Sequence, residues 1–239
     1  MRIAFESTVG LRWTAIGVAV VLLGAALGCK EEPAGPTAVQ ESPGDGTLTL
    51  KVVAEAEGRD TAANTYETVF TATVSDTFGA PVSGAAVTIV ATFGTLQLQE
   101  DDVVTGTYRS LHGGYALGSY TLDVTRGADR VTGVTVTAPA IHTVTKPAAN
   151  DVVTANAAFN VRWARPDTAD ETRLETRDYS SDWYYGDQGT SWIPSVGNPP
   201  RTDQRVRVYR RNVQIAARGL PGSQLSVSIR RTVEPIVAE

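Results

Sequence analysis

The chain has 239 residues, of which 42% are hydrophobic and 20% are charged, and its formal net charge is −5. This balance excludes a chain that is disordered by composition and a membrane protein with many spans. Threonine and valine together supply 59 residues. Because β-branched side chains suit strands better than helices, an all-helical fold is not expected.

The N-terminus has the three-part layout of a secretory signal peptide. Arg2 and Arg12 precede an apolar run over residues 15–27, and the small Gly28 stands before Cys29. A transmembrane helix needs about 20 apolar residues, which is more than this run provides. We therefore expect residues 1–28 to be removed as a signal peptide, and an uncleaved membrane anchor is the alternative.

Cys29 is the only cysteine, which excludes an intramolecular disulfide. The segment Ala26-Leu27-Gly28-Cys29 resembles the lipobox of bacterial lipoproteins, although that motif usually has leucine where Ala26 stands. The resemblance implies a diacylglyceryl group on the Cys29 sulfur and fatty acyl chains, such as palmitate, that anchor the protein to the cell envelope. Lys30 in place of aspartate implies sorting to the outer membrane. Two or three chains anchor stably, because each buried methylene contributes about 0.8 kcal/mol.

Residues 29–46 are expected to form the lipidated cysteine and a flexible tether. The stretch 30–46 is rich in proline, glycine and glutamate and has no hydrophobic periodicity. Such composition is typical of a solvated linker.

Residues 47–140 are expected to form a β-sandwich. From Thr47 onward, apolar and polar residues alternate with period two, as in antiparallel strands with one buried face. The alternating or apolar runs cover residues 48–52, 70–74, 85–93, 96–98, 103–109, 117–124 and 131–136. Seven or eight short strands in about 95 residues, with turn residues between them, are typical of a sandwich.

Two motifs in this region resemble those of bacterial immunoglobulin-like and carboxypeptidase-regulatory-like domains. Asp-x-x-Gly-x-Pro-Val-x-Gly-Ala-x-Val, from Asp76 to Val87, resembles their passage from strand B to strand C, and Gly118 to Val124 resembles their Gly-x-Tyr-x-Leu-x-Val strand. The resemblance implies an Ig-like sandwich in which Tyr120 anchors a corner. Such domains serve as spacers, adhesins and enzyme appendages, so the resemblance is specific for fold and not for function.

Residues 141–239 are expected to form a second sandwich of Ig-like or fibronectin-like type. Phe159, Val161 and Trp163 share one face of an early strand, which indicates Trp163 as a core aromatic residue. Later runs cover residues 173–176, 191–193, 204–213 and 224–233. The predicted fold class is therefore all-β, with two consecutive Ig-like antiparallel β-sandwich domains after the signal peptide and flexible tether.

Charge is divided unevenly between the two halves. Residues 44–140 carry a net charge of −6 and residues 141–239 a net charge of +2. On one strand, Arg205, Arg207 and Arg211 would share a face. They form either a basic patch for an acidic partner or a solvated face with cross-strand carboxylate partners. Nucleic acid is not an expected partner, because the half is not strongly basic and carries no nucleic-acid-binding motif.

The sequence offers no recognisable catalytic, cofactor or metal motif. His112 and His142 lie in different halves and are expected to be exposed, and with Cys29 assigned to lipid no zinc site can be assembled. No serine-hydrolase, zinc-protease or nucleotide-binding pattern is present. The acidic clusters at 100–102 and 167–171 favour turns over calcium or glycosidase sites. We therefore expect no enzyme, metal or cofactor, and a hydrolase remains as a minor alternative.

The segment 178–194 concentrates five aromatic residues, with Asp182, Asp187 and Gln188 beside them. The rings could stack on sugars while the polar groups take hydroxyls, form a protein-binding hot spot, or close the end of the second core. The residues singled out are Trp183, Tyr184, Tyr185 and Trp192.

Together these features predict a membrane-anchored lipoprotein of the cell envelope with a non-catalytic structural, adhesive or partner-binding role. The alternative is a carbohydrate-binding accessory lipoprotein that uses the aromatic segment 178–194. The expected partners are the membrane, through lipid on Cys29, and either another envelope protein or a surface polysaccharide.

Overall fold

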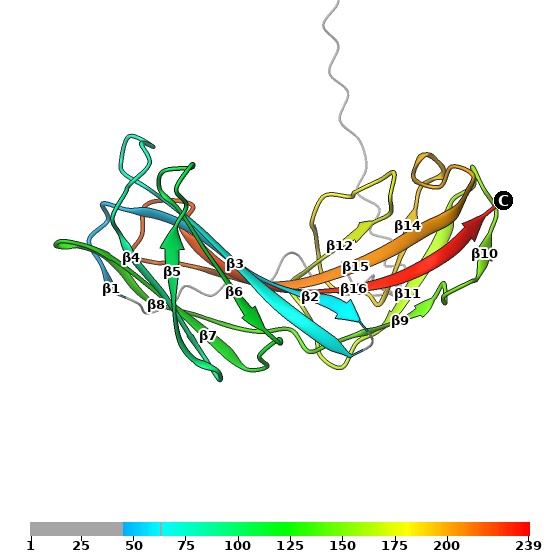
Figure 1. Ribbon diagram of the computed structural model, residues 1–239, viewed down its shortest axis with the longest axis horizontal. Coiled ribbons are helices and arrows are strands. Elements are labelled where there is room, and N and C mark those ends of the chain that lie inside the picture. Colours follow the sequence, from blue (N-terminus) through cyan, green and yellow to red (C-terminus); the bar gives the residue numbers. More distant parts are fainter. Residues whose placement is uncertain (1–44, 63) are drawn as a thin grey trace, which may run out of the picture. The chain divides into compact units, whose positions relative to one another are not determined.

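The computed structural model describes residues 45–62 and 64–239 (Figure 1). The expected signal peptide, Cys29 and the tether up to residue 44 lie outside the described residues. The described part of the chain consists of sixteen strands and one 3-10 turn and contains no α-helix, so the predicted all-β fold class is confirmed. Within the same part, no helix is long and apolar enough to cross a membrane.

The strands follow one another with short connections. In chain order they are β1 (Asp45–Gly46), β2 (Lys51–Ala62), β3 (Thr65–Ser75), β4 (Ala86–Ala91), β5 (Gly94–Glu100), β6 (Thr107–Gly113), β7 (Ser119–Arg126), β8 (Asp129–Thr137), β9 (Thr143–Lys146), β10 (Val152–Val153), β11 (Phe159–Ala164), β12 (Glu171–Glu175), β13 (Tyr184–Tyr185), β14 (Thr190–Ile193), the 3-10 turn η1 (Ser195–Gly197), β15 (Arg201–Ile215) and β16 (Gln224–Ala238).

The first module, built from β1 to β8, is a sandwich whose two sheets share one strand. One sheet has the order β1, β8, β7, β4, β5, and the other continues from β5 through β6 and β3 to β2. The shared strand pairs with β4 along residues 94–98 and then with β6 at Gln99 and Glu100. A chain with this topology closes one side of the sandwich without a free edge.

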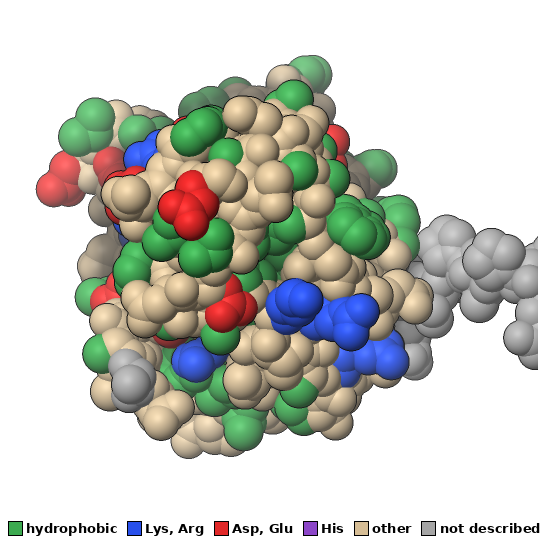
Figure 2. All heavy atoms as spheres, turned by 90° about the vertical axis from the view of Figure 1, so that its right-hand side faces the viewer, with side chains coloured by type: hydrophobic (Ala, Val, Ile, Leu, Met, Phe, Trp, Pro, Cys, Tyr) green, Lys and Arg blue, Asp and Glu red, His purple; other side chains and the backbone are tan. Residues whose placement is uncertain are grey.

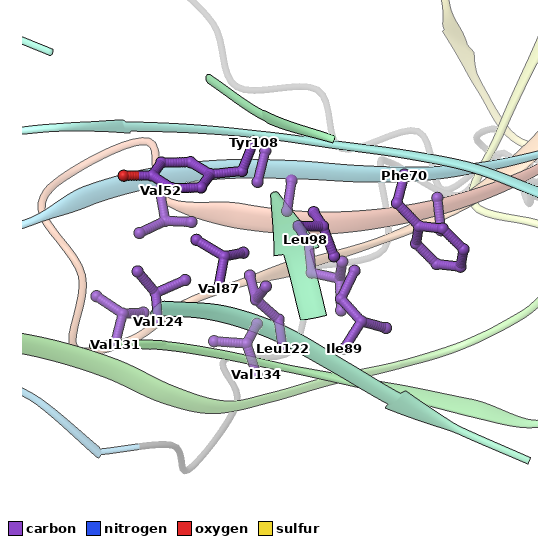
Figure 3. Close-up of a cluster of buried hydrophobic side chains, with 14 of the residues drawn as sticks. Val52, Phe70, Val87, Ile89, Leu98, Tyr108, Leu122, Val124, Val131 and Val134 are labelled. Atoms are coloured by element: carbon purple, nitrogen blue, oxygen red, sulfur yellow. The ribbon is translucent and has the colours of Figure 1, made fainter. Parts of the chain in front are cut away.

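Alternation along the strands places the first core between these two sheets. Val52 and Phe70 from one sheet face Val87, Ile89 and Leu122 from the other, and all five side chains are at most 1% exposed (Figure 3). Each fully buried aliphatic or aromatic side chain of this kind stabilises the fold by about 1.5–3 kcal/mol. The period-two pattern therefore predicts both the strands and the face that each one buries.

Two local features follow the sequence motifs closely. The Asp76 Oδ1 atom accepts hydrogen bonds from the N–H groups of Phe78 and Ala80, at 2.8 and 2.9 Å, and Gly79 has a φ of 79°. The Tyr120 hydroxyl donates to the carbonyl of Ala116 at 3.0 Å. Both the turn and the tyrosine corner expected from the motifs are confirmed.

The second module packs the three-stranded sheet β14, β11, β9 against β12, β15 and β16. Trp163 is 4% exposed within this core, as its position on an alternating strand predicts. The other buried members of the core are Val161, Leu174, Ile193, Val206, Val208 and Ile236. Both modules are thus β-sandwiches, each with its own core.

The C-terminal hairpin of β15 and β16 belongs to both modules. Residues 224–230 of β16 run parallel to residues 53–59 of β2, and Leu225 and Val227 are 0% exposed in the first core. The other end of the hairpin supplies Val206 and Ile236 to the second core. The expected domain boundary at residue 140 therefore does not separate the two cores completely, because residues near the turn of the hairpin pack in the first core.

Candidate functional site

The outward side of β12, β15, β16 and β2 forms one continuous surface, which we name the charged face. Odd-numbered residues of β15 point to this surface, and even-numbered residues such as Val206 and Val208 point to the core. Cross-strand register brings the neighbouring charges of β12, β16 and β2 beside them. The charged face consists of Glu171, Arg173, Glu175, Arg205, Arg207, Tyr209, Arg211, Arg230, Glu55, Glu57 and Arg59.

The expected basic patch is balanced by carboxylates. Arg205 and Arg207 both donate to the Glu175 Oε1 atom, at 2.9 and 2.8 Å, and the Tyr209 hydroxyl donates to Oε2 at 2.9 Å. Burial alone would raise the pKa of Glu175, but the hydrogen bond from Tyr209 and the two guanidinium charges outweigh it, so the pKa lies below its usual value. The arginines thus have the cross-strand partners of a solvated sheet face.

Trp183 lies on this charged face and not in the second core. The Arg211 guanidinium stands 4.0 Å from the centre of the Trp183 ring and pairs with Glu171 at 2.5 Å. Arg173 stands 5.1 Å from the same ring and 4.1 Å from the Tyr209 ring. Guanidinium groups over aromatic rings attract electrostatically and hold both partners in place. Part of the Trp183 ring is therefore already occupied by the protein itself.

The charged face continues across the hairpin onto the first module. Arg230 lies 3.5 Å from Asp60 and 3.9 Å from Glu57, which also pairs with Arg59 at 3.0 Å. Burial, helped by the neighbouring Glu57 charge, raises the pKa of Glu55. Charges of both signs alternate along the whole surface, which favours specific partners over a general attraction to polyanions.

The remaining aromatic residues of the segment 178–194 do not join Trp183 in one platform. Tyr185 is 67% exposed and pairs in register with Glu171 at the edge of the charged face. Trp192 is 63% exposed on the outer side of the other sheet, where it pairs with Asn160. Tyr184 is half-buried opposite Thr172. The two exposed rings therefore lie on opposite sides of the sandwich.

The side of the second module that carries β10 and β14 has a different charge pattern (Figure 2). Most of the lysine and arginine side chains visible there lie together, and acidic side chains are scattered among uncharged surface. Neither sign of charge covers this side.

Sequence reasoning missed a buried charge cluster around Arg210, which is 0% exposed. Its Nε atom donates to Asp187 Oδ2 at 2.6 Å, and its Nη2 atom donates to Asp167 Oδ1 at 2.7 Å. Its Nη1 atom donates to the Ala140 carbonyl at 2.9 Å, and Asp187 also accepts the Trp163 indole N–H at 2.8 Å. Asp187 is therefore a core carboxylate and is not available to a sugar hydroxyl.

The alternation of buried and exposed residues along β15 could have predicted this cluster from the sequence. Arg210 lies on the same face of the strand as the core residues Val206 and Val208. Arg205, Arg207 and Arg211 lie on the opposite face. A charged residue on the buried face needs a buried counter-charge. Ala140 lies at the connection between the modules, so the cluster also fastens that connection to the second module.

Both histidines differ from the expected exposed positions. His142 is 0% exposed, and its Nε2 atom lies 3.2 Å from the Val208 carbonyl. Burial, with the nearby Arg210 and Arg231 charges, lowers the pKa of His142 to about 3. His112 is half-buried with its ring 4.3 Å from that of Phe93. His142 is therefore neutral at pH 7 and acts as a core residue.

The acidic clusters have partners within the protein: Glu100 of the cluster at 100–102 binds backbone amides, whereas Asp167 and Glu171 of the cluster at 167–171 pair with Arg210 and Arg211. Glu100 accepts hydrogen bonds from the N–H groups of Gly84 and Gly106, at 2.9 and 3.0 Å, and these bonds lower its pKa. In the part of the chain that the structure describes, no group of three His, Cys, Asp or Glu residues is placed to hold a metal ion.

Comparison with known proteins finds only distant structural matches. No family model and no curated protein matches the chain. The adhesin InvE of Yersinia pseudotuberculosis is 15% identical with a TM-score of 0.27, and the match covers 77% of this chain and 60% of the adhesin. The chain thus spans less than two thirds of that structure.

Two fibronectin-type structures match over a similar share of the chain. The fibronectin(III)-like modules of CbhA from Clostridium thermocellum are 12% identical with a TM-score of 0.24, and the match covers 80% of this chain and 94% of theirs. The two-domain fibronectin type III segment of chicken tenascin is 15% identical with a TM-score of 0.24, covering 80% and 100%. At these identities and TM-scores, the function has to be argued from the residues of this chain.

Proposed function

We propose that the chain is a membrane-anchored lipoprotein of the cell envelope, held through lipid on Cys29, that acts as a non-catalytic two-module binding unit. One observation carries the binding role: the charged face extends without interruption from the second module onto the first, along a hairpin that both cores share. A surface on one packed scaffold keeps its charges in fixed register, and preorganised charges favour a specific partner.

The chemistry of this surface indicates a protein partner of mixed charge. Arginine, tyrosine and tryptophan are the residues that dominate binding hot spots. Trp183, Tyr185, Arg173 and Arg211 supply all three types within one part of the charged face. Arg173 stacks against the Trp183 and Tyr209 rings and forms no ion pair within the described residues, and we propose that it pairs with a carboxylate of the partner.

The anchor is tested by changing the thiol. Cys29→Ala is expected to move the protein from the membrane pellet to the soluble exported fraction, because the acyl chains are lost. Ser195→Ala, at an exposed position, serves as the matched control and is expected to leave the protein in the pellet. If Cys29→Ala stays in the pellet after a high-salt wash, the lipid anchor is wrong.

The binding face is tested by capture from envelope extract with wild-type protein and two variants. Trp183→Ala with Tyr185→Ala is expected to lose the captured protein, whereas Trp192→Ala, which removes an equally exposed ring from the other sheet, is expected to retain it. Equal capture by both variants would contradict a partner site on the charged face.

A carbohydrate-binding role is the second candidate, and the exposure of Tyr185 and Trp192 favours it. A single exposed ring can stack on one sugar face. Capture of envelope polysaccharide that disappears with Trp192→Ala, or with Tyr185→Ala alone, would support this candidate in place of a protein partner.

A further inference from the structure

Two loops of the first module carry apolar side chains at their tips. Phe78, between β3 and β4, is 94% exposed, and Val103, between β5 and β6, is 90% exposed. Val104 beside it is 48% exposed. The two loops lie side by side, because the Gly106 backbone contacts Val74 and approaches Pro81 and Val82 closely. Apolar side chains that gather on neighbouring loops form an exposed patch of the kind that marks an interaction surface.

Hydrogen bonds within each turn fix the backbone of the two loops that carry these exposed side chains. Asp76 and Asp101 each use one carboxylate oxygen to accept the N–H groups within their own turns, including those of Phe78, Val103 and Val104. Those two bonds to Val103 and Val104 lower the pKa of Asp101. Glu100 clamps the two loops together through Gly84 and Gly106. The acidic groups thus serve the backbone, and the apolar residues form the tips.

The tips lie at the end of the module where the described chain begins. β2 starts there, with Lys51 paired to Ser75, and β1 pairs with the start of β8. The turn of the C-terminal hairpin reaches the same end, where Gly222 approaches Lys51. An apolar hollow at this end is lined by Leu48, Ile215, Ala216, Ala217, Gly219, Leu220, Pro221 and Gly222. The tether expected between Cys29 and residue 44 therefore joins the module at the end that carries the apolar tips.

Exposed cations surround this end as well. Lys51, Arg126 and Arg218 are exposed and form no ion pair within the described residues. The two loops themselves also carry the acidic side chains of Asp76, Glu100, Asp101 and the exposed Asp102. Apolar tips flanked by unpaired cations are the features with which a protein enters the headgroup region of a bilayer, since the rings and methyl groups are buried while the cations meet phosphates.

We propose that Phe78, Val103 and Val104 insert into the interface of the membrane that carries the anchor, so that the first module docks on the lipid surface by this end. The proposal rests on the lipid anchor of the proposed function. Fifteen residues separate Cys29 from Asp45, and a coil of this length has a root-mean-square span of about 20–25 Å. Such a tether keeps the tips at a high effective concentration at the bilayer, so weak insertion is enough.

The test uses the full-length protein with an environment-sensitive dye on a single engineered thiol. The variants are Phe78→Cys and Val103→Cys at the tips, and Leu117→Cys as a matched control. Leu117 is 53% exposed on the loop between β6 and β7, at the opposite end of the same module. All three sites are exposed, so none of the substitutions disturbs a core. Acylated Cys29 takes up no dye.

Each labelled protein is reconstituted in protein-free vesicles of phosphatidylethanolamine and phosphatidylglycerol, with and without spin-labelled headgroups. The dye at positions 78 and 103 is expected to lose intensity to the spin label and to shift its emission to shorter wavelength. The dye at position 117 is expected to do neither. Quenching at the tips alone supports the proposal.

The other outcomes overturn it in distinguishable ways. If the protein floats with the vesicles but the dye at position 78 is as unquenched as at 117, lipid docking is wrong and the anchor stands. If wild-type protein takes up dye at Cys29 and does not float, both the anchor and the docking are wrong. If position 78 is shielded in native envelope membranes but not in these vesicles, a protein partner and not lipid covers the tips.

Discussion

The buried Arg210 guanidinium offers the sharpest test of how the second module is held together. Arg210→Met keeps most of the side-chain volume but removes every donor to Asp187, Asp167 and the Ala140 carbonyl. The Asp167 side chain is 38% exposed and can rehydrate, whereas that of Asp187 is 0% exposed and cannot. Leaving one buried charge unpaired costs about 3–5 kcal/mol. We therefore expect the free energy of unfolding to fall by about this amount.

The assay is unfolding in guanidinium chloride, followed by tryptophan fluorescence on the soluble Cys29→Ala protein. Arg205→Met is the matched control, because Glu175 keeps Arg207 and Tyr209, and its expected cost is at most about 1 kcal/mol. Arg210→Met combined with Asp187→Asn is expected to be more stable than Arg210→Met alone, because the unpaired charge is gone. Equal losses for Arg210→Met and Arg205→Met, or no recovery in the double variant, would refute the reasoning.

Three further predictions concern the hairpin, the buried histidine and the aromatic segment. Leu225→Ala, in the first core, is expected to lower the free energy of unfolding by about 2–5 kcal/mol. The unfolding midpoints measured by tryptophan fluorescence and by circular dichroism should fall together, although the tryptophans at 163, 183 and 192 are all in the second module. Separate transitions for the two signals would show that the hairpin does not couple the modules. The pKa of His142 in the folded protein lies below its usual value of 6.5, so on acidification the unfolded chain binds this proton before the folded protein does. The free energy of unfolding is therefore expected to fall between about pH 6.5 and pH 3, by on the order of 1 kcal/mol per pH unit. In a pH series of unfolding curves, His142→Gln should lose this slope, and an unchanged slope would contradict the assignment. Trp183→Ala is expected to cost about 1–2 kcal/mol in chemical denaturation, as for a surface ring held by two guanidinium groups, and a loss of about 3–5 kcal/mol would instead place the ring in a core.

Local pattern was sufficient to predict most strands and their buried faces. The runs at 70–74 and 204–213 lie within β3 and β15, and Trp163 is in a core, because period two is a property of neighbouring residues. The turn at Asp76 and the corner at Tyr120 were predictable for the same reason, since each depends on hydrogen bonds within a few residues.

Long-range partners were not predictable in this way. The parallel pairing of β16 with β2 joins residues about 170 positions apart, and alternation specifies a face but not a neighbour. Asp187 was read with the aromatic segment, because its ion pair with Arg210 depends on how β15 meets the loop before β14. For the charged face, the sequence predicted that Arg205, Arg207 and Arg211 lie on one side of a strand. It did not predict their partners Glu171 and Glu175, because those contacts depend on how β12 pairs in register with β15.

The central claim is that fatty acyl chains attach this pair of sandwiches to a bilayer. Mass spectrometry of the mature protein extracted from envelope membranes tests it most directly. We expect an N-terminal peptide that begins at Cys29 and carries a diacylglyceryl group on its sulfur. A mature N-terminus with an unmodified Cys29 thiol, or a chain that still begins at Met1, would contradict it.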